Sequence, residues 1–381
     1  MTQVDTVFFR ILRAALWGGS VEIPEGFSQW SAVMKLAKTQ ALMGLVADVL
    51  LTRTEIRESL PVKFVERLQD IPMTNVGMHS QMNMTLQLLV LTLRNAGIEP
   101  VLLKGQGLSK CYPTPELRQC GDIDIYVGNE KYEKAYDAIL PMSSSIEEKC
   151  RIWDTMHFDA SVGAIMIEVH HQADVVYSRS GANLYKQIMC DGLSKDLVPI
   201  RFGEVDVMTP SDTFNAFYVF HHLWRHYSSS GVGLRQFCDW TCFLHTHVGK
   251  LDLPYLKKIL DDLGFMKPWQ VFGCFLVKDL GLPEEEFPFY NKRYVGKVDR
   301  VREYVMTDGN FGINVLSNQE TRRGYIHGKW ITVKYYLFRF FRMFGVFPKH
   351  TILRLYYMLR DGFAHVLKEF QLRLCTKQRY H

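Results

Sequence analysis

Two aspartates separated by one residue, Asp122 and Asp124, are the side chains of this sequence with the clearest capacity for chemistry. They lie in Gly-Asp-Ile-Asp-Ile-Tyr-Val, residues 121–127, where alternating polar and apolar residues predict a β-strand. Successive side chains of a strand point to opposite faces, so both carboxylates would share one face, about 7 Å apart. Asp is uncommon in strands and like charges repel, so the pattern favours a divalent cation such as Mg²⁺ between them.

The segments before and after these aspartates predict the elements that must position them. Apolar residues recur at helical spacing through residues 5–95, and Gly97 is the residue type that most easily closes a helix. The pattern then changes to short extended runs. Strands are predicted in residues 100–105 and 122–127, a helix in residues 130–139, and two hairpins in residues 156–171, turning at Gly163, and 199–210, turning at Gly203-Glu204.

A helix-start signal marks the end of this mixed segment. Residues 209–212, Thr-Pro-Ser-Asp, place a proline and an aspartate where a helix begins, and helical patterns continue from there. We therefore predict an α+β fold with a small mixed sheet. Its three regions are an N-terminal helical region (1–97), an α/β core (98–208) and a C-terminal helical region with a basic tail (209–381).

Composition excludes several classes of protein. With 47% hydrophobic and 22% charged residues in 381, the chain has the composition of a packed globular protein. Charged residues interrupt every apolar run before 18 residues, so no transmembrane helix is expected. Arg10 and Arg13 divide the first apolar run, which predicts an amphipathic helix rather than a signal peptide. We expect a cytoplasmic protein.

The cysteines and histidines give no support for a zinc protein. Eight cysteines are scattered without a Cys-x-x-Cys pair, so a zinc ribbon or redox dithiol has no basis in the sequence. Thirteen histidines include no His-Glu-x-x-His pattern, so a zinc hydrolase has none either.

Positive charge is concentrated at the C-terminus. Residues 329–381 hold eleven Lys or Arg against Asp361 and Glu369, a net charge of +9. Because the whole chain carries +5, the first 328 residues carry −4. This basic tail is explained by helices that pack on the core with their Arg side chains turned outward, or by contact with RNA or an anionic surface.

Several of these motifs together resemble a known superfamily. The segment at 121–127, with Leu-Leu-Lys-Gly upstream, is similar to the polymerase-β-like nucleotidyltransferases, and more narrowly to uncharacterised bacterial nucleotidyltransferases. The matching residues are Lys104-Gly105, Tyr112, Arg118, Gly121 to Ile125, Ile167 to His170, and Gly-Leu-Arg-Gln-Phe-Cys-Asp-Trp at 233–240. The resemblance extends over residues from about 5 to 350. It departs from the strict superfamily turn, Gly followed by Gly or Ser, because Lys-Gly-Gln-Gly stands at 104–107.

This resemblance implies a fold and an activity. It implies the polymerase-β-like core and transfer of a nucleoside monophosphate from a nucleoside triphosphate to an acceptor hydroxyl. It also implies two Mg²⁺ ions, with Mn²⁺ as an alternative, held by Asp122, Asp124 and a third acid on a neighbouring strand. Alternation in residues 164–171 puts Ile167 on the core side and Glu168 on the other face, so Glu168 is the expected third ligand and the candidate proton acceptor.

The resemblance also suggests residues that bind the nucleotide and residues on the acceptor side. Lys104, Gly105, Arg118 and Gly121 are the expected nucleotide-binding residues. Lys104 and Arg118 could offset phosphate charge, or they could be ordinary surface charges. The residues assigned to the acceptor side are His170, Arg235 and Asp239.

Each of these acceptor-side residues also has a structural explanation. His170 shares a face with Glu168, so it could orient a ligand or contact a phosphate. Arg235 and Asp239 stand four residues apart on one helix, so they could simply form a salt bridge with each other.

Two other functions stay open at this stage. One is a non-catalytic nucleotide-binding or antitoxin-like module. The presence of Asp122, Asp124 and Glu168 argues against it, because a protein without catalysis need not keep three like charges together. The other is an RNA-binding protein that uses the basic tail, and a salt-dependent RNA affinity lost with residues 329–381 would favour it.

Overall fold

A seven-stranded mixed β-sheet carries the core of the protein. The computed structural model describes residues 1–172, 179–229, 231–309, 339–356 and 360. Within these residues the strand order is β3-β4-β5-β2-β1-β7-β6, with β2–β5 and β1–β7 parallel and the other pairs antiparallel. The strands are β1 (Val101–Leu103), β2 (Ile123–Tyr126), β3 (Ser145–Ile146), β4 (His157–Val162), β5 (Ile165–His170), β6 (Val198–Phe202) and β7 (Val205–Thr209). The predicted α+β fold is confirmed.

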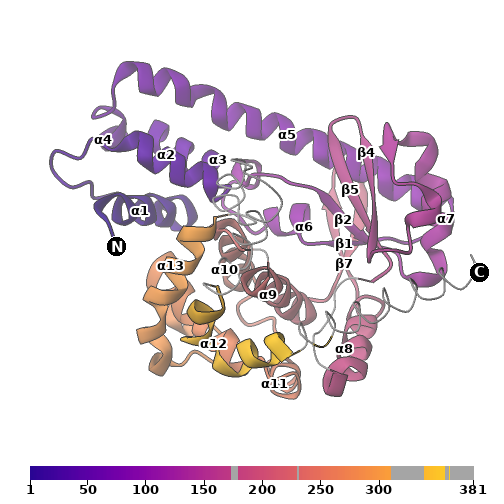
Figure 1. The fold of residues 1–381 in the computed structure, drawn as a ribbon. Coiled ribbons are helices and arrows are strands. Elements are labelled where there is room, and N and C mark those ends of the chain that lie inside the picture. Colours follow the sequence, from indigo (N-terminus) through magenta and orange to yellow (C-terminus); the bar gives the residue numbers. More distant parts are fainter. Residues whose placement is uncertain (173–178, 230, 310–338, 357–359, 361–381) are drawn as a thin grey trace, which may run out of the picture. The chain divides into compact units, whose positions relative to one another are not determined.

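Helices form the chain before the sheet, as the helical spacing of apolar residues predicts. The first is fixed at its start by Thr2, whose Oγ1 accepts a hydrogen bond from the Asp5 backbone while Asp5 accepts one from the Thr2 backbone. These helices are α1 (Gln3–Trp17), α2 (Trp30–Thr39), α3 (Met43–Thr52), α4 (Thr54–Arg57) and α5 (Val62–Asn95). Figure 1 shows α5 as a long rod that runs from the N-terminal helices to the sheet.

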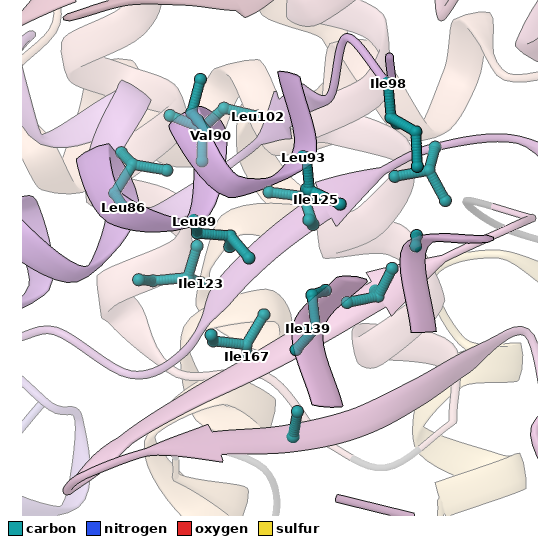
Figure 2. Close-up of a cluster of buried hydrophobic side chains, with 14 of the residues drawn as sticks. Leu86, Leu89, Val90, Leu93, Ile98, Leu102, Ile123, Ile125, Ile139 and Ile167 are labelled. Carbon is teal, nitrogen blue, oxygen red and sulfur yellow. The ribbon is translucent and has the colours of Figure 1, made fainter. Parts of the chain in front are cut away.

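One face of the sheet is buried under α5 and the helix α7 (Tyr132–Ile139). In the close-up of Figure 2, Leu89 and Leu93 of α5 lie over Ile123 and Ile125 of β2, and Ile139 of α7 lies near β5. All of these side chains are at most 1% exposed. Burial of this apolar layer fixes which face of each strand is turned inward, so the alternating residues of β2 and β5 are turned to the opposite face.

Further helices follow the strands. The start of α9 is set by Ser211, whose Oγ accepts a hydrogen bond from the Phe214 backbone; Pro210 precedes the helix rather than lying in its first turn. The remaining α-helices are α6 (Gly105–Ser109), α8 (Arg179–Gly192), α9 (Asp212–Ser228), α10 (Leu234–Thr246), α11 (Leu253–Asp262), α12 (Met266–Phe275) and α13 (Val298–Asp308). Short 3₁₀ turns occur at Pro115–Leu117, Asn129–Lys131, Leu140–Met142, Lys149–Arg151, Glu284–Glu286 and Lys292–Lys297, and a π-helical turn at Leu276–Leu280.

By packing, the chain divides into two compact units, Met1–Asp174 with Gln187–Asn318 and Val175–Lys186 with Gln319–His381. In the second unit, residues 339–344 and 348–356 are helical. Most of the basic tail lies outside the described residues, so its role stays a prediction. None of the helices in the described part of the chain is long and apolar enough to cross a membrane.

Candidate active site

Three carboxylates meet on the face of the sheet opposite α5. In the parallel pairing of β2 with β5, Asp124 is the partner of Glu168, while Ile123 is the partner of Ile167. The strand register therefore puts both acids on one face and both isoleucines in the core. Asp122 precedes β2, and one carboxylate oxygen from each of the three acids lies within 4.8 Å of the others. The structure thus brings together the acids that the sequence singles out.

The two aspartates have opposite electrostatic environments. The nearby Asp124 charge, together with burial, raises the pKa of Asp122 to about 6. Burial alone would raise the pKa of Asp124 as well, but Lys104 and His170 hold that pKa well below its usual range. Asp124 is therefore the fixed anion of the cluster, whereas the charges of Lys104 and Arg235 offset the repulsion on Asp122 only in part.

Lys104 comes directly after β1 and reaches the cluster. Its Nζ lies 3.0 Å from Asp124 Oδ1 and 3.5 Å from His222 Nδ1. Burial would lower the pKa of Lys104, but the Asp124 carboxylate raises it, so the ammonium stays charged. The turn that places it is strained: Lys104 has a φ of 51° and Gly105 a φ of 45°, in the left-handed region that non-glycine residues rarely adopt.

Two histidines lie beside the carboxylates. His170 Nε2 is 3.1 Å from Asp124 Oδ1 and 3.4 Å from Glu168 Oε2, and His157 Nε2 is 3.9 Å from Glu168 Oε2. Burial would lower the pKa of His170, but hydrogen bonding to Asp124 and Glu168 raises it. His170 thus contacts both acids through one ring nitrogen. His157 joins them because β4 pairs it with His170.

Arg118 has a buried partner that the sequence does not reveal. Its Nε and Nη2 donate to the two carboxylate oxygens of Asp239 at 2.7 and 2.8 Å, and Tyr112 Oη donates to Asp239 Oδ1 at 2.7 Å. Burial would lower the pKa of Arg118, but the adjacent Asp239 charge raises it. The ion pair of Asp239 is thus made with the α/β core rather than with Arg235, its neighbour four residues away on α10.

Arg235 lies near this ion pair but is bonded differently. Its Nη1 donates to the Gln119 backbone oxygen at 3.0 Å, whereas its buried Nε has no hydrogen-bond partner among the described residues. Burial and the charge of Arg118 lower the pKa of Arg235. Gly121 is in contact with it, because a Cβ at this position would stand 3.5 Å from Arg235 Nη1.

Most of these groups, but not His170 or Tyr112, line one cavity of about 270 Å³. We call Asp122, Asp124 and Glu168 its acidic wall, and the side chains of α9 and α10 that include Arg225 and Arg235 its basic wall. Lys104 and Arg118 come from the α/β part, and Asp239 comes from α10. The side chains from α9, His222, Arg225 and His226, were missed by the sequence reasoning, although their i, i+3, i+4 spacing puts them on one helix face. The charged residues of the lining are Asp122, Asp124, Glu168 and Asp239 against Lys104, Arg118, Arg225 and Arg235.

The comparison with protein families agrees with this geometry. A sequence profile for a family of uncharacterised nucleotidyltransferases matches residues 28–277 of the chain. That range includes β1 to β7, the acid cluster and the basic wall of the cavity, and it covers more than half of the chain. The protein belongs to this family of uncharacterised nucleotidyltransferases. No curated protein and no solved structure shows significant similarity to it.

Proposed function

We propose that this nucleotidyltransferase moves a nucleoside monophosphate from a nucleoside triphosphate to an acceptor hydroxyl, with release of pyrophosphate, in the cavity beside Asp122, Asp124 and Glu168. The observation that carries the proposal is the convergence of these three acids, with oxygens within 4.8 Å of one another, in a cavity that also holds four Lys and Arg side chains. A divalent cation needs such oxygen ligands, and a triphosphate needs the cations around them.

The electrostatics of the three carboxylates support the binding of divalent cations. The raised pKa of Asp122 arises first from the Asp124 charge, so a cation held by both carboxylates would relieve their repulsion. Asp122 and Asp124 would hold two cations, Mg²⁺ or Mn²⁺, with Glu168 as a further ligand of one of them. When bound, such ions neutralise phosphate charge and make a hydroxyl more acidic.

Three side chains of the site would bind phosphate, accept a proton and position the acids. The Lys104 ammonium, kept charged by Asp124, faces the cavity and offsets charge on the phosphates. The side chain of Glu168 is 24% exposed, more than those of Lys104 and His170, the ionic partners of Asp124, so it is placed to take the proton of the acceptor hydroxyl. His170 keeps Asp124 and Glu168 in position through its Nε2.

The proposal is tested by following label from the α-phosphate of each of the four nucleoside triphosphates. The protein is incubated with Mg²⁺, one labelled triphosphate and an extract of cells, and labelled products are separated. We expect label to enter an acceptor with the wild type and not with an Asp122→Asn, Asp124→Asn double variant that remains folded. If label transfer is equal for the two proteins, or absent for both while the triphosphate stays intact and unbound, the proposal is wrong.

A further inference from the structure

The cations that line the cavity differ in whether the protein already neutralises them. Lys104 is paired with Asp124 at 3.0 Å. Arg118 is held by both oxygens of Asp239, at 2.7 and 2.8 Å, with 5% of its side chain exposed. A buried ion pair of this geometry is costly to separate, because it leaves two uncompensated charges. Arg118 is therefore committed to Asp239, and its donors are directed at a protein carboxylate.

Arg235 is the contrasting case. It is 8% exposed and lines the cavity, and the described residues include no carboxylate within salt-bridge distance of it. Its Nη1 donates to the Gln119 backbone oxygen, while its Nε is buried without a partner. A guanidinium offers five N–H donors, so most of its hydrogen-bonding capacity is unused within this part of the protein.

Burial of this guanidinium without a paired carboxylate opposes folding of the ligand-free protein. Buried polar groups are normally hydrogen-bonded, and a buried charge without a counter-ion is more costly still. The charge of Arg118 adds to this cost, and the charges of Asp239 and Asp122 offset part of it. The neighbouring α10 residues Leu234 and Phe237 are fully buried apolar residues, so the helix itself does not require a charge there. A negatively charged ligand would provide the hydrogen-bond acceptors and the counter-ion that the guanidinium lacks.

The position of the guanidinium indicates which part of a ligand it meets. It lies against Gly121, where a Cβ would stand 3.5 Å from Nη1 and 3.8 Å from Nη2, directly before Asp122 in the chain. The charge of Arg235 is among those that act on the Asp122 carboxyl, after the stronger effect of Asp124. Arg235 thus borders the acid cluster, where a cation-bound triphosphate would lie in the proposed function.

We infer that Arg235 binds the terminal phosphates of the nucleoside triphosphate, and that Arg118 does not contact the nucleotide but holds α10 in place through Asp239. This inference rests on the proposed function and deepens it. It replaces two assignments made from the sequence, which put Arg118 on the phosphates and Arg235 on the acceptor side. Planar guanidinium donors bind phosphate oxygens in pairs, which suits Arg235 to this task.

Thermal unfolding without ligand distinguishes the roles of Arg235 and Arg118. Arg235→Met removes a buried charge that has no carboxylate within salt-bridge distance among the described residues, so its midpoint of thermal unfolding should stay within about 3 °C of the wild type or rise. Arg118→Met leaves Asp239 buried and unpaired, so its midpoint should fall by about 6 °C or more. Arg201→Met is the matched control, because Arg201 lies at the exposed edge strand β6, with 52% of its side chain accessible.

Calorimetric binding to the full-length protein then tests the contact itself. The probes, each with Mg²⁺, are the four nucleoside triphosphates, the monophosphate of the tightest one, and inorganic pyrophosphate. Arg235→Met should weaken triphosphate and pyrophosphate binding about 10- to 100-fold, the effect of losing charged hydrogen bonds, and monophosphate binding less than about 3-fold. Arg235→Lys should lose about 3- to 10-fold, because it keeps the charge without the paired donors.

The outcomes distinguish this inference from the proposed function. If the wild type binds triphosphate and a folded Arg235→Met binds it equally well, the inference fails and the proposed function stands. An equal loss for monophosphate and triphosphate overturns the assignment to the terminal phosphates. If Arg235→Met does not fold, full triphosphate affinity in Arg235→Lys overturns it instead. If the wild type binds no triphosphate, the proposed function fails and this inference with it.

Discussion

Replacing Asp122 with Asn should stabilise the metal-free protein, whereas replacing Asp124 with Asn should destabilise it. The pKa of Asp122 is raised from 3.8 to about 6, chiefly by the Asp124 charge. Because the pKa is higher in the folded state, the ionised carboxylate opposes folding, and this effect is complete only above about pH 6. Two pKa units correspond to about 3 kcal/mol at pH 8 and, by the same linkage, about half of that at pH 5.

The ionised carboxylate of Asp124 has the opposite effect on the free energy of unfolding. Its pKa is lowered by Lys104 and His170 against the effect of burial, so its charge stabilises the fold at any pH above about 4. Asp124→Asn leaves the Lys104 ammonium without its carboxylate partner in a largely buried position. Breaking a buried pair in this way costs about 3 to 5 kcal/mol. The two neighbouring substitutions are therefore expected to differ by several kcal/mol in the free energy of unfolding.

Urea unfolding in EDTA, at pH 8 and at pH 5, measures both effects. The control is Asp137→Asn on the outer side of α7, whose exposed ion pair with Lys149 should contribute less than about 1 kcal/mol. Added Mg²⁺ should stabilise the wild type and reduce the advantage of Asp122→Asn, because the cation relieves the repulsion that the substitution removes. If Asp122→Asn is destabilising, or if its gain is the same at both pH values, the electrostatic reasoning about this site is wrong.

Three further substitutions test other parts of the site. Glu168→Gln should keep most of the triphosphate affinity but lower the transfer rate by about 10²-fold or more, as expected for a lost base, and rates within a few-fold of the wild type would exclude that role. Asp239→Asn should lower the free energy of unfolding by about 3 to 5 kcal/mol because Arg118 loses its buried counter-ion, and urea unfolding that matches the wild type would contradict this. Tyr112→Phe removes one donor to Asp239 and should cost only about 1 to 2 kcal/mol in the same measurement, so a loss as large as that of Asp239→Asn would show a different role for the hydroxyl.

The sheet could be predicted from sequence because its signals are local. Alternation in residues 122–127 and 164–171, with turns at Gly163 and Gly203, predicts strands that the structure has within a residue or two. The orientation of Glu168 follows from the same alternation. Because the Ile167 side chain is buried in the core, the next side chain must point to the opposite face of the strand. The parallel pairing of β2 with β5 brings Glu168 beside Asp124, and that contact depends on tertiary packing.

The partners of the charged residues could not be predicted in this way. Sequence spacing makes Arg235 the natural partner of Asp239, because i and i+4 positions are adjacent on a helix. The structure instead pairs Asp239 with Arg118, 121 residues away. Similarly, the sequence treats Asp122 and Asp124 as equivalent ligands. Lys104, placed in a strained turn, and His170 make Asp124 a compensated anion, whereas the pKa of Asp122 is raised by the Asp124 charge.

The cavity is assembled from two parts of the chain, the α/β part and the helices α9 and α10, and each part contributes both acidic and basic side chains. The strands contribute Asp122, Asp124 and Glu168, whereas Arg235 comes from α10. The bidentate ion pair between Arg118, which precedes β2, and Asp239 of α10 joins these two parts with 5% and 6% side-chain exposure. A shift of α10 would break this buried pair, so the ion pair fixes the distance between the acidic and basic walls. Binding of a cation-loaded triphosphate requires both walls at a set separation, because catalysis of phosphoryl transfer depends on positioning and charge rather than on covalent chemistry.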